Sequence, residues 1–208
     1  FYIADLVDHL LEKRLKAFIE NNNCQLVVED TPLLLTPQSA IDDHFGRGKK
    51  PLMAKFYEMQ RKRLDILIDD DGSPHGGQWS FDADNRKKLP KGIVVPAEPG
   101  TDQHGELQSN LNQLKSEQLP LLGDGEHFNY PFNHAQAALW LDQFLDDRLK
   151  DFGAYEDAIS RQHRVMWHGV LTPMLNIGLL TPRQILDRTL ERAKQVDIPL
   201  NSLEGFIR

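Results

Sequence analysis

Residues 168–183 read HGVLTPMLNIGLLTPR, and this stretch indicates the fold more strongly than any other part of the chain. Its pattern predicts two helices joined at Gly178. Thr181 is a favourable N-cap for the second helix, and Pro182 suits the first helical position. Helix starts of this kind are common in structural proteins, so these residues alone do not assign a ligand to the segment.

The chain has a helical pattern from residue 131 to its end. Over 134–151 one apolar stripe recurs at helical spacing, and we expect Gly153 to end that helix. The stripe consists of Ala138, Leu141, Leu145 and Leu149, with Trp140 and Phe144 beside it. Further helices are predicted over 156–166, 172–179, 182–194 and from 200 onward.

Two apolar segments open the chain. Residues 3–20 place apolar and charged side chains on different faces, which predicts an amphipathic helix without a cap residue. Residues 24–29 predict a short buried strand. A helix followed by a buried strand is typical of an α/β unit with a parallel sheet. Two more helices are expected, over 37–45 and 52–68.

From residue 69 to about residue 130 the composition shifts to Gly, Pro, Asp, Gln and Asn, with one plausible short helix near 107–115. A segment of this length without regular structure is unusual inside a compact domain, so a domain boundary is expected within it. We therefore predict a mixed, mainly α chain that divides into residues 1–48, 49–130 and 131–208.

Composition restricts the function classes. Hydrophobic residues make up 40% of the 208 residues, enough for an ordinary core, and no apolar run approaches the roughly 18 residues of a membrane span. A formal charge of −7 argues against a protein that coats nucleic acid over its whole surface, but it does not exclude a local basic patch. The run Arg86-Lys87-Lys88, with Lys91, is either a solvated loop or a face that approaches DNA.

Cysteine and histidine spacing argues against a metal site. Cys24 is the only cysteine, which excludes an internal disulfide and a cysteine-only metal site within the chain. We expect it to be a small buried residue of the strand, and such sparse cysteine usage fits a reducing cytoplasm. His163 and His168 are five positions apart, which is off the helical relation that shares a face, and no acidic residue completes a site.

Four stretches, which form three motif blocks, resemble one protein family and occur in the family's order along the chain. The stretch 168–183 is similar to the flavin-cradling segment T-S-x-L-S-P-x-L-x-x-G-x-L-S-P-R of photolyases and cryptochromes, with His168 and Gly169 replacing the first two residues. FYEMQRKR (56–63) and GGQWSFDADNRKKLP (76–90) resemble the photolyase-related proteins of bacteria and archaea. PLNSLEGFIR (199–208) resembles the opening of the EGFIRQ-x-x-GWRE element of that branch.

The resemblance implies a domain organisation. Residues 1–48 would be the end of a Rossmann-like α/β antenna domain, 49–130 a connector, and 131–208 the start of an all-α FAD-binding domain. The chain would then be a fragment of a longer protein. An antenna chromophore such as a ribityl lumazine and an iron–sulfur cluster are implied for that longer protein, and the cluster ligands would lie outside this chain.

The resemblance also implies FAD-binding residues. Thr172 would cap its helix and donate to the flavin phosphates, because unpaired donors gather at a helix start. His168 would donate to phosphate or ribose, and Gly169 would let the backbone approach closely. Leu171 belongs to the same segment. Tyr155 lies near where the family places an aromatic hydroxyl, and simple packing is its alternative role.

The implied function is light-driven repair of UV pyrimidine photoproducts, of the (6-4) type, by electron transfer from reduced FAD. The longer protein would be a photolyase-type lyase with UV-damaged DNA as its partner, and no membrane or protein partner is evident. No catalytic residue is expected in this fragment, which would bind FAD weakly and repair no DNA. Two alternatives stay open: a cryptochrome-like blue-light photoreceptor without repair activity, and a helical protein-interaction module.

Overall fold

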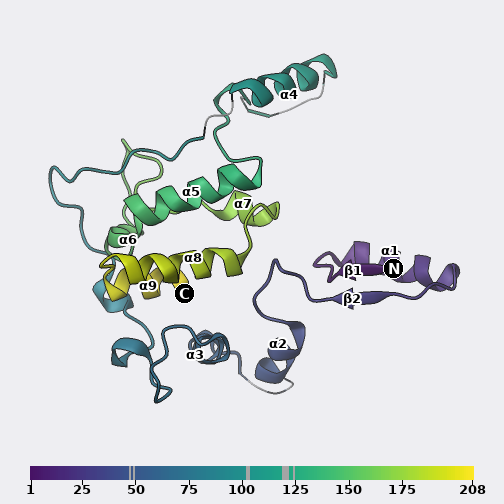
Figure 1. The fold of residues 1–208 in the computed structure, drawn as a ribbon, viewed down its shortest axis with the longest axis horizontal. Helices are drawn as coiled ribbons and strands as arrows, with labels where there is room; N and C mark the ends of the chain where they lie inside the picture. Colours follow the sequence, from purple (N-terminus) through teal and green to yellow (C-terminus); the bar gives the residue numbers. More distant parts are fainter. Residues whose placement is uncertain (47, 49, 102–103, 119–121, 124) are drawn as a thin grey trace.

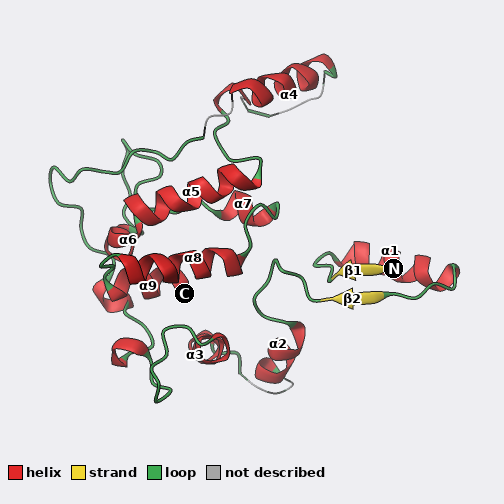
Figure 2. Cartoon of the chain, in the orientation of Figure 1, coloured by secondary structure: helices red, strands yellow, loops and turns green. Residues whose placement is uncertain are grey.

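The computed structural model describes residues 1–46, 48, 50–101, 104–118, 122–123 and 125–208 (Figure 1). Over these residues it contains nine α-helices, three short 3-10 helices and one two-stranded sheet, so the expected mainly α composition is confirmed (Figure 2). None of the described helices is long and apolar enough to cross a membrane. In chain order the elements are β1 (Tyr2–Ala4), α1 (His9–Asn21), β2 (Val27–Glu29), α2 (Gln38–Phe45), α3 (Met53–Leu64), η1 (His75–Gly77), η2 (Asp82–Asp84), α4 (His104–Ser116), η3 (Gly125–His127), α5 (His134–Asp147), α6 (Leu149–Tyr155), α7 (Thr172–Asn176), α8 (Pro182–Gln195) and α9 (Leu200–Ile207).

The N-terminal unit consists of β1, α1 and β2. The two strands pair in parallel, with Ile3 opposite Val28, as expected for strands joined through a helix. The prediction of an uncapped helix from residue 3 is wrong, because residues 2–4 form β1 and α1 begins after Asp8. The Asp8 carboxylate caps α1 by accepting from the Leu11 N–H at 2.7 Å. In Figure 1 this unit lies apart from α5–α9, and α1 buries none of its residues.

The next two helices lead into the connector. α2 agrees with the predicted range, whereas α3 stops four residues short of its predicted end at 68. Asp65 and Leu67 adopt left-handed backbone conformations, with φ of +55° and +51°, which reverse the chain. The Arg61 side chain, only 2% exposed, holds this reversal by donating to the carbonyls of Ile66 and Leu67.

Regular structure is sparse between α3 and α5, while the domain boundary expected there stays a prediction. α4 coincides with the helix expected near 107–115, and it projects away from the other helices in Figure 1. The remaining described residues between α3 and α5 form only 3-10 turns and one isolated bridge, between Ile68 and Pro74. Figure 2 shows most of this part as loop.

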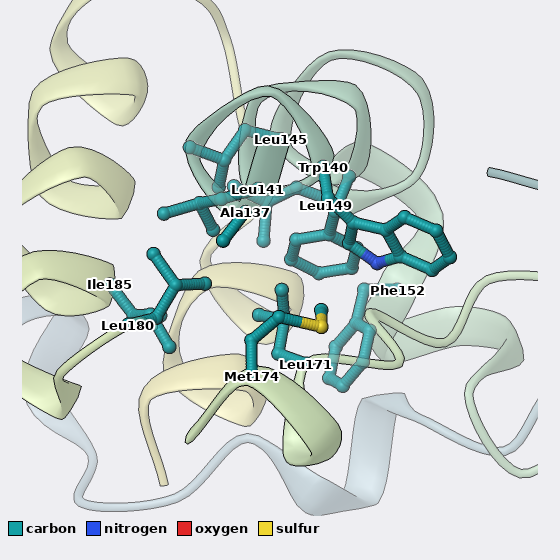
Figure 3. Close-up of a cluster of buried hydrophobic side chains, with 11 residues drawn as sticks. Ala137, Trp140, Leu141, Leu145, Leu149, Phe152, Leu171, Met174, Leu180 and Ile185 are labelled. Atoms are coloured by element: carbon teal, nitrogen blue, oxygen red, sulfur yellow. The ribbon is translucent and has the colours of Figure 1, made fainter. Parts of the chain in front are cut away.

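Helices α5 to α9 enclose the hydrophobic core. α5 supplies one apolar face, and α6, α7 and the start of α8 close around it (Figure 3). Ala137, rather than the predicted Ala138, belongs to the buried stripe. The core consists of Ala137, Trp140, Leu141, Phe144, Leu145, Leu149, Phe152, Leu171, Met174, Leu180 and Ile185, each at most 8% exposed. Complete burial of each large side chain stabilises the fold by about 1.5–3 kcal/mol.

Gly153 does not end a helix, and that prediction is wrong. The predicted single helix 134–151 is two helices, α5 and α6, which meet at Arg148, and Gly153 lies within α6. A Cβ atom on Gly153 would lie 2.7 Å from the Asn201 carbonyl oxygen and 2.7 Å from the Asn85 Oδ1. Glycine is therefore needed where α6 crosses α9 and the loop around Asn85, because only a residue without a side chain lets these backbones come so close.

Residues 156–171 contain no helix, which corrects the prediction for 156–166. Met166 and Val170 have φ of +54° and +50°, which a regular helix does not allow. The following helix, α7, ends at Asn176 and not near 179, and Gly178 (φ +75°) then turns the chain. α8 begins as predicted, because Thr181 forms a capping box with Gln184.

Candidate functional site

A cavity of about 500 Å³ lies beside the segment 168–172. Four of the five predicted cofactor-binding residues line it: His168, Gly169, Leu171 and Thr172. Tyr155 is not part of the lining. Its ring packs on Trp167 with the ring centroids 4.8 Å apart, and its cofactor role stays a prediction. The other lining residues are Leu35, Phe152, Val170, Leu175, Pro182, Ile185, Leu186, Phe206 and Ile207.

The segment that lines the cavity carries unpaired backbone donors. Val170 is left-handed and Leu171 is right-handed (φ −90°, ψ −14°), and successive residues of opposite hand turn their N–H groups toward one side. The N–H groups of Val170, Leu171 and Thr172 have no hydrogen-bond acceptor among the residues that the structure describes. Three unpaired donors in a row form a concavity suited to an anion.

Thr172 does not cap α7, which corrects the role predicted for its hydroxyl. Leu171 occupies the N-cap position, and no side chain caps this helix. The Thr172 side chain is exposed at the cavity, and its hydroxyl has no partner in the described part of the chain. His168 is also exposed there. Both groups are therefore free to donate to a ligand.

The rest of the cavity wall is apolar. Phe152 of α6 and Phe206 of α9 pack edge to face, with ring centroids 5.3 Å apart. Leu175, Ile185 and Leu186 complete the wall from α7 and α8. The lining includes no Lys, Arg, Asp or Glu. An anionic ligand in this cavity would therefore be held by N–H and hydroxyl donors, while its apolar part packs on aromatic and aliphatic side chains.

A second cavity, of about 540 Å³, adjoins the first and shares Leu35, Leu186 and Ile207 with it. α3 and the Trp79 loop form much of its wall. The Arg61 guanidinium lies 5.1 Å from the Trp79 ring centroid, within the range of a cation–π interaction.

The segments around residues 57, 81 and 204 meet at one buried carboxylate. Glu204 is fully buried and accepts hydrogen bonds from the Tyr57 hydroxyl and the Phe81 N–H, both at 2.9 Å. Burial, followed by the negative charge of Glu204, raises the pKa of the Tyr57 phenol. Arg208 adds an ion pair to Asp82 at 2.8 Å. Sequence analysis missed this junction, although an acidic residue within the apolar helix LNSLEGFI was a usable signal.

Three other features were predicted from the sequence: the place of Cys24, the lack of a metal site and the basic run at 86–91. Cys24 precedes β2 and is half-buried, so its predicted place inside the strand is wrong. No group of three His, Cys, Asp or Glu side chains among the described residues could hold a metal ion. In the basic run, Arg86 pairs with Asp157 at 2.8 Å, while Lys87 and Lys88 are exposed. Contact of this run with DNA stays a prediction.

Comparison with known proteins identifies relatives. The family described as deoxyribodipyrimidine photo-lyase-related protein matches residues 1–130. A (6-4) photolyase of Agrobacterium fabrum is 28% identical over 166 residues, which are 79% of this chain and 32% of that protein. Two uncharacterized proteins of Acanthamoeba polyphaga mimivirus are also similar. One is 32% identical over 97 residues (45% of this chain, 49% of that protein), and the other is 40% identical over 55 residues (26% and 43%).

The matches therefore span about a third to a half of the length of these relatives. The match to the Agrobacterium protein extends over most of the chain and is longer than the family match.

Proposed function

Because the chain belongs to the family of deoxyribodipyrimidine photo-lyase-related proteins, we propose that it is part of a flavin-dependent enzyme for light-driven DNA repair. The substrate would be a UV pyrimidine photoproduct of the (6-4) type, as the name of the Agrobacterium relative suggests. The observation that carries the proposal is the cavity beside residues 168–172, where unpaired N–H donors and apolar aromatic side chains meet.

The residues of this cavity fit a flavin dinucleotide. Its volume of about 500 Å³ lies within the range of small-molecule and cofactor sites. The N–H groups of Val170, Leu171 and Thr172 would hold the diphosphate, together with the Thr172 hydroxyl and the His168 imidazole. Phe152, Phe206 and Leu175 would pack on a ring system, since aromatic and aliphatic walls remove it from water.

Bound FAD would supply the light-driven electron transfer that splits the lesion, which is chemistry that no protein side chain provides. The residues of this chain would bind and orient the flavin, and they would exclude water from it. A lesion within duplex DNA must leave the base stack to reach a buried cofactor, and a damaged base is easier to flip out. Cys24 is the only thiol of the chain, so an iron–sulfur cluster of the whole protein would require other ligands. A lumazine-type antenna would likewise belong to the whole protein.

The test uses the full-length protein that contains this chain. Flavin content is measured on the purified protein, and repair is then followed under blue light on two oligonucleotides, with one (6-4) photoproduct or one cyclobutane dimer. We expect stoichiometric FAD and light-dependent loss of the (6-4) lesion. Flavin-loaded protein that repairs neither lesion would instead indicate a photoreceptor. Protein that neither carries nor binds flavin would refute the proposal.

One substitution links the cavity to this activity. Thr172→Val removes the free hydroxyl and keeps the side-chain volume, so we expect weaker FAD binding. Asn176→Ala is the matched control, because Asn176 is exposed at the other end of α7 and does not line the cavity. Equal effects of the two substitutions would contradict the assignment of Thr172.

A further inference from the structure

Arg148 is a charged side chain in the interior of the helical region. It is 1% exposed, at the junction of α5 and α6. Among the described residues no carboxylate forms an ion pair with its guanidinium, and its hydrogen bonds go to backbone carbonyls. Burial of a cation without an ion pair is costly, and desolvation lowers the pKa of Arg148, although the nearby charge of Asp147 opposes this.

The partners of Arg148 lie on two irregular segments. Its Nε donates to the Met166 carbonyl at 3.1 Å, and its Nη2 donates to the Ala97 carbonyl of the connector. An ion pair at 2.6 Å between Arg164 and Glu98 joins the same two segments from the outside. The planar guanidinium can bond two carbonyls in fixed directions, which a lysine side chain cannot do.

Trp140 of α5 adds a second anchor. Its indole Nε1 donates to the Gly169 carbonyl at 3.1 Å, and its ring is 1% exposed in the core (Figure 3). Trp140 within α5 and Arg148 at the end of α5 therefore hold residues 166–169 at both ends. The fastened stretch contains the left-handed Met166 and leads directly into the left-handed Val170. Left-handed backbone at such residues is strained and persists only where surrounding contacts enforce it.

We propose that Arg148 is a positioning residue for the phosphate-binding backbone of residues 170–172, and that it acts through the Met166 carbonyl. This inference rests on the proposed function, because it assigns the diphosphate of a dinucleotide to those N–H groups. The buried positive charge also favours an anion nearby, since attraction is strong where water is excluded. Arg148 itself does not line the cavity and does not touch the ligand.

The test compares two flavins on the full-length protein after removal of its bound cofactor. FAD carries a diphosphate and an adenosine that riboflavin lacks, so the ratio of their dissociation constants reports the binding of this ADP part of the cofactor. For Arg148→Met we expect FAD affinity to fall about tenfold or more, by analogy with residues that orient metal ligands, with little change for riboflavin. General loosening of the fold would weaken both flavins and leave the ratio unchanged.

Arg61→Met is the matched control. Arg61 is an equally buried arginine that bonds backbone carbonyls, but those carbonyls lie at Ile66, Leu67 and Trp79, outside the flavin segment. We expect this substitution to leave the FAD to riboflavin ratio at its wild-type value. Where Arg148→Met does not fold, Arg148→Lys keeps the charge, loses the double contact to two carbonyls, and is measured in the same way.

The outcomes separate the two proposals. A wild-type protein that binds no FAD refutes the proposed function. A wild-type protein that binds FAD, with an unchanged ratio in the Arg148 variants, refutes only the positioning role. An equal change of the ratio in the Arg61 variant refutes it as well.

Discussion

Gly153→Ala adds one methyl group where α6 crosses α9. The new Cβ would lie 2.7 Å from the Asn201 carbonyl oxygen, 2.8 Å from the Asn201 carbonyl carbon and 2.7 Å from the Asn85 Oδ1. Two of these atoms belong to the backbone of α9 and cannot rotate away. Relief of the clash therefore requires α9 to move away from α6, although the Gly153 N–H and the Lys150 carbonyl both bond the Ser202 hydroxyl there.

The magnitude follows from two opposing effects. Alanine is more favourable than glycine within a helix by about 1 kcal/mol. Overpacking costs about 1–3 kcal/mol, and the upper end applies here because backbone atoms must shift. We therefore expect a net loss of about 1–2 kcal/mol in the free energy of unfolding, or roughly 2–8 °C in Tm for a chain of this size.

Gly205→Ala is the matched comparison on α9. A Cβ atom on Gly205 would lie 3.2 Å from the Asn85 Nδ2. This nitrogen donates to no acceptor among the described residues, so a small shift of it breaks none of its hydrogen bonds. We expect Gly205→Ala to be neutral or more stable than wild type by up to about 1 kcal/mol. Urea unfolding of both variants, followed by far-UV circular dichroism, gives the two values. If Gly153→Ala proved as stable as Gly205→Ala, the close crossing of α6 and α9 would be refuted.

Three further predictions concern the buried carboxylate and the cavity. A double-mutant cycle of Tyr57→Phe and Glu204→Gln in urea unfolding should give a coupling energy of about 1.5–3 kcal/mol, because a hydrogen bond to a buried charge is lost; additive effects would contradict it. The raised pKa of Tyr57 means that the folded chain holds this proton more tightly, so its contribution is full below about pH 10 and is lost as pH rises further. Stability measured from pH 8 to pH 11 should therefore fall less steeply in Tyr57→Phe than in wild type, and parallel curves would disprove the shift. Thr172→Val should weaken FAD binding to the full-length protein by roughly fivefold to tenfold, for the loss of one hydrogen bond, and an unchanged dissociation constant in a fluorescence titration would exclude that bond.

The sequence predicted elements whose signals are local. The N-cap at Thr181, the turn at Gly178, the range of α2 and the start of α9 follow from neighbouring residues, and the structure agrees with them. Helical periodicity likewise placed α5, because its buried stripe recurs within a single helix.

The failures have a common physical cause, which is contact between distant segments. Gly153 looks like a helix terminator, but its real constraint is the approach of Asn201, which is far away in the sequence. A helix was predicted over 156–166, yet Arg148 and Trp140 bind the carbonyls of Met166 and Gly169, and Met166 and Val170 have left-handed backbone. Tertiary contacts override local preference in both places. Backbone donors were expected at the helix start beside Thr172, whereas the left-handed Val170 that precedes them leaves no residue-type signature.

The junction at Glu204 also has a consequence for biosynthesis. Its hydrogen bonds to Tyr57 and Phe81 join residues 147 and 123 positions apart, whereas the Trp140 and Ser202 contacts within α5–α9 span only 29 and 49 positions. On a ribosome that adds about 5–20 residues per second, Phe81 is made on the order of 10 s before Glu204. During that interval the Tyr57 hydroxyl and the Phe81 N–H lack their Glu204 acceptor, so this junction forms only after α9 has been made.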